Sequence, residues 1–272
     1  MNLTVIKMRN TWTYQKSKKS LNENAGFIKL FKYNPTGATI HLLTVKDAGY
    51  HIGLDQPVAA LQMIINFLNK NSSNEMEEIS LPRQTLLEYQ PKKIQQTTQQ
   101  LADQIFDLPG LTYAINFNQY SGYLRATKGN YLHYWFVESQ NTPSIDPLII
   151  WFNGGPGCSS LGGLFIENGP FHLNSDGNTL FENVFSWNKL ANILYIESPR
   201  QVGFSYQNWS INPSTEFNDI LTTIDAYEAI VDFFKIFANF KTNDLYIAGE
   251  SYGGIYVSAL TAYIVEKIQV QF

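Results

Sequence analysis

Cysteine is almost absent from this sequence, with Cys158 the single example among 272 residues. One cysteine cannot form a disulfide within these residues. The opening residues 1–9 are too short and too soon charged for a signal peptide, and no apolar run approaches the length of a membrane span. A net charge of −4 with mixed signs indicates no nucleic-acid partner. Without metal-ligand spacing among four histidines, we expect neither metal nor cofactor.

The most informative feature present is a Gly-x-Ser-x-Gly turn at residues 249–253. The apolar residues 245–248 before it favour a strand, and residues 255–268 after it favour a helix. A strand that turns sharply into a helix lifts the serine hydroxyl clear of the sheet edge, and the glycines make room for the tight backbone. The pattern therefore predicts Ser251 as a nucleophile.

A second glycine-rich turn lies at residues 153–160, directly after an apolar run at 148–152 that we expect to be a strand. Backbone N–H groups of such a turn can stabilise the oxyanion that forms when a serine attacks a carbonyl. We expect the donors to be the N–H groups of Gly155 and of Tyr252, the residue after the nucleophile. Two such turns in an α/β pattern predict a serine hydrolase.

The two turns resemble those of the serine carboxypeptidase family, and the resemblance extends from about Ala102 to Glu266. Further matching motifs occupy residues 108–111, 119–123, 133–136, 138–139, 167–170, 186–188, 197–199 and 202–206. The resemblance implies an α/β fold class: a partial α/β-hydrolase sheet flanked by helices. It also implies a peptide or protein substrate with a free C-terminus and no membrane partner; a homodimer is an open alternative.

The resemblance assigns the binding of the substrate's C-terminal carboxylate to Asn153, Glu167 and Glu250, with Trp151 completing the network. When two glutamates converge in a low-dielectric pocket, the free-energy cost of ionising both carboxyl groups is high. At least one is then protonated and can donate a hydrogen bond to a carboxylate, which favours acid pH. The alternatives are a solvent-facing Glu250 and a simple turn role for Glu167.

The expected acid and base of a triad follow the serine along an α/β-hydrolase chain. Both would therefore come after Phe272, and we expect an incomplete or inactive form of the enzyme. The resemblance also implies a secreted, vacuolar or lysosomal protein, so the missing signal indicates a truncated or misassembled chain, or a cytosolic member. In the family the cysteine corresponding to Cys158 pairs with one further along; a buried thiol is the alternative.

The first part of the chain resembles the C-terminal end of the same family. Residues 26–33 and 38–45 favour two strands joined by a turn, and Pro57 opens a helix with one apolar stripe. We predict three segments: a carboxypeptidase tail at 1–69, a polar linker at 70–100, and the front half of a carboxypeptidase at 101–272. A fused tandem pair explains this order more simply than a circular permutation.

The loop at residues 48–57 corresponds to the one that carries the catalytic histidine in the family. An ungapped match puts Tyr50 at the histidine position and His51 one place late. One position moves a side chain by about 3.8 Å, more than a hydrogen bond to the serine tolerates. His51 is therefore either a displaced base or an ordinary polar loop residue.

Within the last segment, residues 192–196 favour a buried strand. Apolar residues from 217 to 234 recur at helical spacing, and Ser214 or Thr215 is the expected cap of that helix. The leading function is a serine carboxypeptidase that forms an acyl-enzyme on Ser251. The alternatives are a non-catalytic pseudo-peptidase that acts by binding, and an acyltransferase on the same scaffold.

Overall fold

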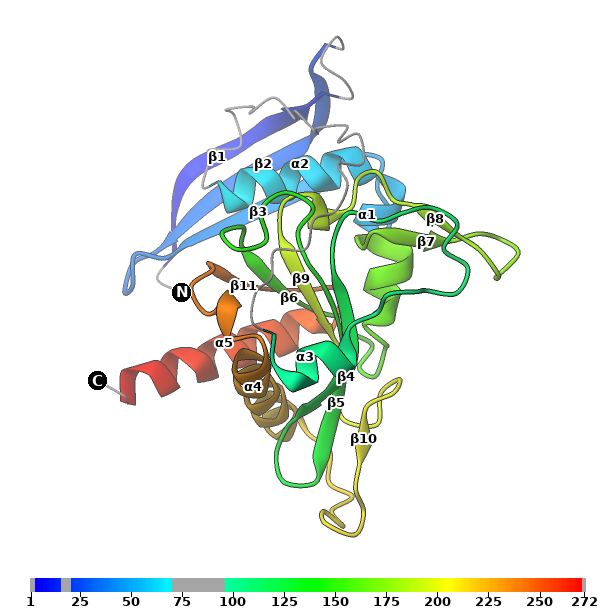
Figure 1. The fold of residues 1–272 in the computed structure, drawn as a ribbon. Coiled ribbons are helices and arrows are strands. Elements are labelled where there is room, and N and C mark those ends of the chain that lie inside the picture. Colours follow the sequence, from blue (N-terminus) through cyan, green and yellow to red (C-terminus); the bar gives the residue numbers. More distant parts are fainter. Residues whose placement is uncertain (1–2, 16–20, 70–95, 271–272) are drawn as a thin grey trace. The chain divides into compact units, whose positions relative to one another are not determined.

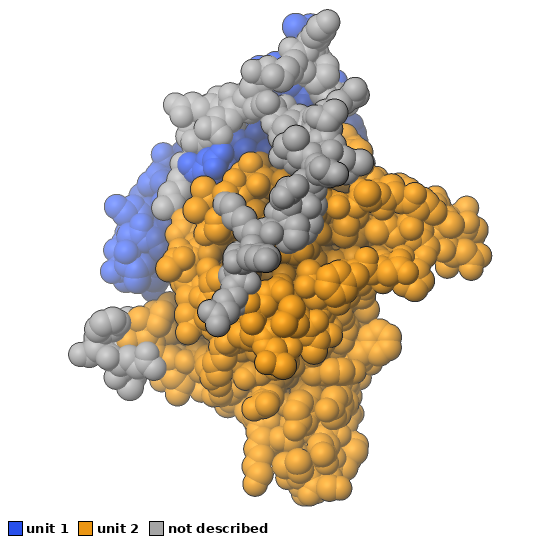
Figure 2. Space-filling view, in the orientation of Figure 1, with its two compact units in different colours: residues 1–83 blue, residues 84–272 orange. Residues whose placement is uncertain are grey.

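A computed structural model describes residues 3–15, 21–69 and 96–270, which belong to two compact units, residues 1–83 and 84–272 (Figure 2). Most of the expected linker, residues 70–95, lies outside the described residues. Its final residues belong instead to helix α3 (Thr98–Asp103). The side chain of Thr97 accepts from Gln100 N–H and that of Gln100 from Thr97 N–H, a capping box that starts the helix.

The first unit is a three-stranded antiparallel sheet with two helices. Strands β1 (Leu3–Tyr14), β2 (Glu23–Tyr33) and β3 (Thr39–Val45) lie in the order β1-β2-β3. Helices α1 (Ile52–Asp55) and α2 (Pro57–Leu68) follow (Figure 1). The sequence did not predict β1, because its apolar and polar residues do not alternate regularly and most of its side chains are exposed.

This unit has a small core of its own. Trp12, Ile28 and Ala59 are at most 1% exposed and belong to one apolar cluster. The indole Nε1 of Trp12 donates to the carbonyl oxygen of Thr44 at 2.9 Å, which satisfies the one polar atom of that buried ring. Helix α2 begins at Pro57 as predicted, since proline tolerates the first helical position.

The second unit is built on a six-stranded mixed sheet. Its order is β10-β5-β9-β6-β11, with β4 paired to β5. The strands are β4 (Gln119–Arg125), β5 (Asn130–Val137), β6 (Leu148–Phe152), β9 (Asn192–Ile196), β10 (Tyr206–Gln207) and β11 (Leu245–Gly249). Strands β9, β6 and β11 run parallel, and every residue of β6 and β9 is buried, as expected for central parallel strands. The two strands predicted at 148–152 and 192–196 are thus confirmed.

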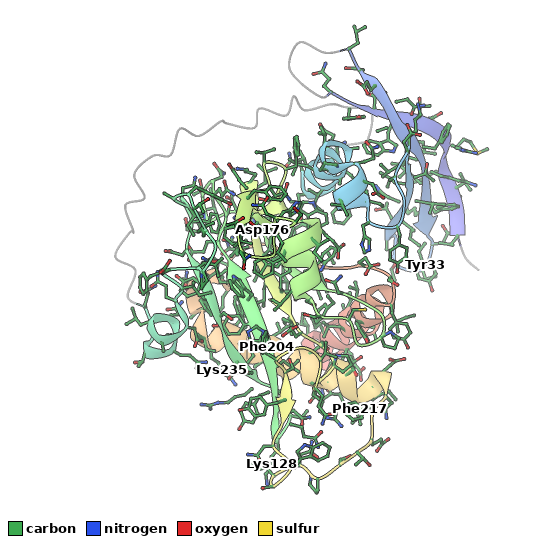
Figure 3. All side chains as sticks on the ribbon, turned by 90° about the vertical axis from the view of Figure 1, so that its right-hand side faces the viewer. Tyr33, Lys128, Asp176, Phe204, Phe217 and Lys235 are labelled. Atoms are coloured by element: carbon green, nitrogen blue, oxygen red, sulfur yellow. The ribbon has the colours of Figure 1, made fainter. Side chains whose placement is uncertain are left out.

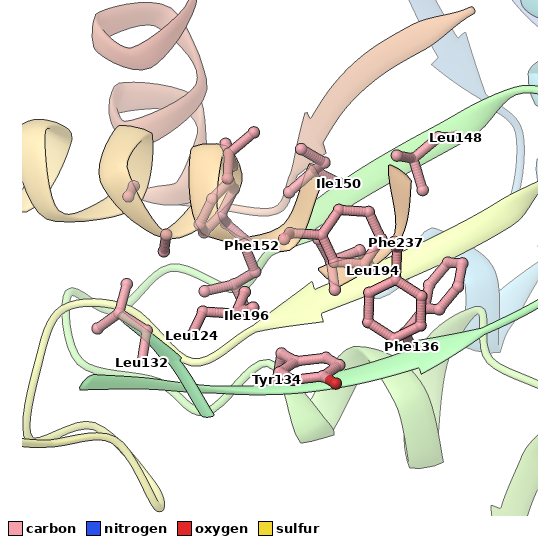
Figure 4. Packing of buried hydrophobic residues seen from close by; sticks show 14 of the residues in the cluster. Leu124, Leu132, Tyr134, Phe136, Leu148, Ile150, Phe152, Leu194, Ile196 and Phe237 are labelled. Atoms are coloured by element: carbon pink, nitrogen blue, oxygen red, sulfur yellow. The ribbon is translucent and has the colours of Figure 1, made fainter. Parts of the chain in front are cut away.

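Helices α4 (Asp219–Ile236) and α5 (Gly253–Val270) contact each other and lie on one face of this sheet (Figure 1). Alternate strand residues face them, because side chains alternate between the two faces of a strand. Figure 4 shows part of this core, with Phe237, the residue that follows α4, labelled. Helix α4 itself supplies Phe233 to the same core. The predicted cap of α4 was wrong: Asn218, not Ser214 or Thr215, accepts from Leu221 N–H, because the helix starts later.

The opposite face carries short elements. They are η1 (Gly163–Glu167), the hairpin of β7 (Phe171–Leu173) and β8 (Leu180–Glu182), and η2 (Trp187–Lys189). Trp151 of β6 meets Trp187 edge-on with ring centroids 5.4 Å apart. A further short helix, η3 (Ala238–Phe240), follows α4.

Replacing Phe136 tests the aromatic core. Its fully buried ring contacts those of Phe233, Phe237 and Phe240 at centroid distances of 5.2, 5.1 and 5.1 Å. Phe136→Ala should lower the free energy of unfolding by about 3–5 kcal/mol through lost contacts and a residual cavity. The same change at Phe106, which is 83% exposed, should cost no more than about 0.5 kcal/mol. Urea denaturation measures both variants. Equal decreases in the free energy of unfolding for Phe136→Ala and Phe106→Ala would contradict this packing.

Candidate active site

Ser251 lies at a sharp turn between β11 and α5. Its φ is +56°, in the left-handed region, where a residue with a side chain costs roughly 1–2 kcal/mol. The carbonyl oxygens of Glu250 and Ser251 accept from the N–H groups of Gly253 and Gly254 at 2.8 and 3.0 Å. The serine is exposed at this turn. The structure therefore has the strand, turn and helix that a nucleophile elbow requires.

Close backbone packing maintains the strained turn. Glu250 N–H donates to the carbonyl oxygen of Phe152 at 3.1 Å, and a Cβ added to Gly253 would lie 2.6 Å from that same oxygen. A Cβ added to Gly154 would lie 2.4 Å from the backbone nitrogen of Tyr252. Both distances are shorter than real Cβ atoms tolerate, so only glycine allows the two turns to approach this closely.

Parallel pairing of β6 and β11 explains why the turns meet. Gly249 lies opposite Phe152 in the register, so both strands end at the same level. In open α/β sheets, binding sites form at the carboxyl ends of the strands. Neither Gly155 N–H nor Tyr252 N–H hydrogen-bonds to another described residue. Both expected oxyanion donors are thus available at this edge.

Trp151, Asn153 and Glu167 form one buried polar cluster. The Oδ1 of Asn153 accepts from Trp151 Nε1 at 2.8 Å and from Gly163 N–H at 3.0 Å. Its Nδ2 donates to Glu167 Oε1 at 2.7 Å. All three predicted side chains are 6% exposed. The three bonds fix the amide orientation of Asn153, because its oxygen receives donors while its nitrogen faces a carboxylate.

Two further groups lie near Glu167. Burial raises the pKa of Tyr195 well above its ordinary value, and the charge of Glu167 raises it further. The neutral Tyr195 hydroxyl donates to Asn168 Oδ1 at 2.8 Å. Burial lowers the pKa of His172, against the opposing effect of a hydrogen bond from its imidazole to the backbone of Glu167. At neutral pH, Tyr195 and His172 are therefore uncharged neighbours of Glu167.

Glu250 comes from the elbow itself and is half-buried. Its Oε1 is buried and has no hydrogen-bond partner among the described residues. A buried polar atom left unpaired is costly, and each one calls for an explanation such as a catalytic role or a bound water or ion. The N–H of Glu250 donates to the carbonyl oxygen of Phe152, which is next to Asn153 in the chain. The two ends of the predicted carboxylate site are thus carried on neighbouring strand ends.

His51 belongs to the first unit, immediately before α1. Its ring meets that of Tyr50 edge-on, with centroids 5.1 Å apart. In the same loop, Asp55 Oδ2 accepts from Gly49 N–H at 2.6 Å. Since Ser251 lies in the other unit, the pairing of His51 with Ser251 stays a prediction.

Cys158 is exposed in the glycine-rich turn and forms no disulfide, so the alternative of a buried thiol was wrong. The turn here projects the side chain outward, with Cys158 N–H donating to the carbonyl oxygen of Gly154 at 2.9 Å. No group of three or more potential metal-binding side chains occurs in the described part of the chain.

Sequence reasoning missed a second polar cluster, formed by Ser121, His133, Ser159 and Glu197, of which His133 and Glu197 are buried and the two serines half-buried. Nδ1 of His133 lies 2.9 Å from Glu197 Oε2, and Ser159 donates to the other carboxylate oxygen. No regular spacing links these residues, because they come from separate strands and a turn. The available signals were the motifs at residues 119–123, 133–136, 153–160 and 197–199, which contain all four residues, and the position of Glu197 directly after the strand Asn192–Ile196.

Comparison with known proteins gives the class to which these features belong. A model of the serine carboxypeptidase family matches residues 109–271. This covers more than half of the chain, so the chain belongs to the serine carboxypeptidase family.

The similar proteins extend well beyond this chain. The lysosomal protective protein of Mus musculus is 50% identical over 60% of this chain, and a Caenorhabditis elegans serine carboxypeptidase, ctsa-4.1, is 48% identical over 60%. The matched part spans 34% of each of those relatives. The crystal structure of Kex1(delta)p, a prohormone-processing carboxypeptidase from Saccharomyces cerevisiae, has a TM-score of 0.54 and 27% identity. That match covers 64% of this chain and 40% of Kex1(delta)p, and it identifies an α/β-hydrolase type of fold.

Two neighbouring glycines allow a direct test of the elbow packing. Gly253→Ala should destabilise the second unit, because its Cβ would overlap the Phe152 carbonyl oxygen. Gly254→Ala is the matched control: an added Cβ there meets no atom within 4 Å. Alanine also favours a helix by up to about 1 kcal/mol, so Gly254→Ala should be neutral or stabilising. Thermal denaturation measures both; a stable Gly253→Ala would show that the turns are not closely packed.

Proposed function

We propose that the protein is a serine-type carboxypeptidase in which Ser251 forms an acyl-enzyme with the substrate. The observation that carries this proposal is the positive φ of Ser251, held at a strand end beside the buried Asn153–Glu167 hydrogen bond. A strained, exposed serine and a recognition group for carboxylates then lie on adjacent turns. This combination fits an enzyme that cleaves next to a free C-terminus.

In the proposed reaction, Ser251 Oγ attacks the carbonyl carbon of the last peptide bond and loses its proton to a base. The carbonyl oxygen becomes an oxyanion, which the N–H groups of Gly155 and Tyr252 stabilise. Collapse of this intermediate breaks the C–N bond, and the base returns its proton to the departing amine. Water then attacks the acyl-enzyme ester, releases the shortened peptide and restores Ser251.

The proposed recognition of the terminal carboxylate uses Trp151, Asn153, Glu167 and Glu250. Asn153 Nδ2 carries two N–H groups, and Glu167 takes one of them. A protonated glutamate can donate to a carboxylate, whereas an ionised one repels it. The unpaired, buried Oε1 of Glu250 supports a role in this contact.

The catalytic base and its acidic partner complete the proposal. In α/β-hydrolases they follow the nucleophile along the chain, so we expect both beyond the matched part. His51, in the loop of residues 48–57, is the second candidate for the base, as the family's C-terminal loop would supply it in a fused pair. We propose that residues 1–272 alone turn over little substrate.

The proposed substrate is a peptide or protein with a free C-terminus. We also propose a lysosomal, vacuolar or secreted location, in keeping with a relative named the lysosomal protective protein. In the described part of the chain, no helix has the length and apolar character required to cross a bilayer. A pseudo-peptidase would bind such peptides without cleaving them, and an acyltransferase would pass the acyl group to a hydroxyl acceptor.

The test uses an extended protein: this chain joined after Phe272 to the part of the mouse relative that follows its matched segment. Glu250→Gln should change kcat/KM little at acid pH, because both side chains can donate a hydrogen bond. Between about pH 4 and pH 8 the mutant should lose less activity than the wild type, since glutamine cannot ionise. The measurement is kcat/KM against pH for a peptide with a free C-terminus.

Three controls accompany this profile. Ser251→Ala should lose several powers of ten in kcat at every pH, and residues 1–272 alone should show little turnover. An amidated peptide should be a poor substrate because it lacks the carboxylate. Parallel pH profiles for wild type and Glu250→Gln would remove Glu250 from the carboxylate site, and full activity of Ser251→Ala would refute the proposed function.

A further inference from the structure

A buried charged group lies below the glycine-rich turn and outside the proposed chemistry. Glu197, directly after β9, is completely buried, and its Oε2 lies 2.9 Å from Nδ1 of His133 on β5. His133 is 7% exposed, and its Nε2 lies 2.9 Å from the hydroxyl of Ser121 on β4. The rings of Tyr123 and Phe204 meet the imidazole edge-on; Phe204 is labelled in Figure 3. Packing and two hydrogen bonds thus fix the histidine.

The carboxylate of Glu197 also joins two loops. Its Oε1 accepts from the hydroxyl of Ser159 in the glycine-rich turn. Its Oε2 accepts from the N–H of Phe204 at 2.8 Å. The next residue of the turn, Ser160, donates to the carbonyl oxygen of Ile196 at 2.6 Å. Two consecutive serines therefore fasten the turn to the end of β9.

The charge of Glu197 strengthens these bonds. Burial by itself would raise the pKa of this carboxyl group, but hydrogen bonds from His133, Ser159 and the Phe204 N–H together lower it below its ordinary value. The carboxylate is therefore ionised at neutral pH. Hydrogen bonds to an ionised acceptor are about twice as strong as those between neutral groups. Ser159 is accordingly held more tightly than an ordinary serine would be.

Ser121, His133 and Glu197 also reproduce the hydrogen-bond order of a catalytic triad. Ser121, however, lies inside β4 and pairs with Trp135 of β5, rather than standing at a strand end. An elbow needs a sharp turn that exposes its serine, which a paired strand residue does not have. Glu197 moreover uses both oxygens on loop residues. The geometry of the cluster therefore suits holding the loops of Ser159 and Phe204 in place rather than catalysis.

We infer that Glu197, oriented by His133, is a positioning residue that fixes the glycine-rich turn through Ser159. The turn carries Gly155, so its placement decides where the oxyanion donor lies. A donor that is slightly misplaced weakens binding of the transition state more than binding of the substrate. The assignment of Gly155 as that donor rests on the proposed function. The hydrogen bond by which Glu197 holds Ser159, and with it the turn, does not.

The test compares Ser159→Ala with a matched control. Ser159 Oγ donates to Glu197 and accepts from Leu161 N–H at 3.2 Å. Ser139 Oγ likewise donates to a carboxylate, that of Asp146, and accepts from the N–H two residues on, Asn141, at 3.1 Å. Ser139→Ala thus removes the same kinds of bond in a different loop, which precedes β6.

The first readout is amide hydrogen exchange in residues 1–272, which needs no catalysis. Ser159→Ala should speed exchange about tenfold in peptides covering residues 154–163 and leave β4 and β5 unchanged. Ser159→Thr keeps the hydroxyl and should restore slow exchange, and Ser139→Ala should leave the turn unaffected. Unchanged exchange in Ser159→Ala, or equal acceleration by Ser139→Ala, would overturn the inference.

The second readout is the kinetics of the extended protein. Ser159→Ala and Glu197→Gln should lower kcat about tenfold or more with KM within about twofold, and Ser159→Thr should recover most of kcat. A loss expressed only in KM would overturn the positioning role. If the unmutated extended protein has no activity, the proposed function fails, and the exchange experiment still decides whether Glu197 fastens the turn.

Discussion

The contact of two backbone turns is the constraint on which this site depends. Gly154 and Gly253 allow the glycine-rich turn, the end of β6 and the elbow to approach more closely than any Cβ would permit. The energy that holds Ser251 at a positive φ must come from surrounding structure, since the residue itself is strained there. Parallel pairing of β6 with β11, and the aromatic core beneath both, supply it.

The same constraint orders the polar groups around the site. Asn153 follows β6 directly, so its position is set by the strand, and its amide is fixed by bonds to Trp151, Gly163 and Glu167. The far side of the glycine-rich turn is fixed separately, by bonds to Glu197 and to the carbonyl oxygen of Ile196. Because β9 lies beside β6, one pair of neighbouring strand ends holds the turn from both sides.

Local patterns predicted the parts of this arrangement that depend on neighbouring residues. Strands β6 and β9, the start of α2 and the strand–turn–helix around Ser251 follow from apolar runs and glycine spacing. The predicted cap of α4 was wrong, because several polar residues precede the helix and only the fold determines that Asn218 is the N-cap. Strand β1 and the His133–Glu197 pair could not be predicted, since both are defined by contacts between residues far apart in sequence. The roles of the site residues and the division into three segments stay predictions.

The central claim is that Ser251 is the reactive serine, and labelling with a fluorophosphonate probe tests it most directly. The probe phosphonylates a serine only where a base and oxyanion donors activate it. Peptide mass spectrometry of the labelled extended protein should place the adduct on the peptide that contains Ser251. An unmodified Ser251 together with an adduct on Ser121 would contradict the account, because the reactive centre would then be the His133–Glu197 cluster.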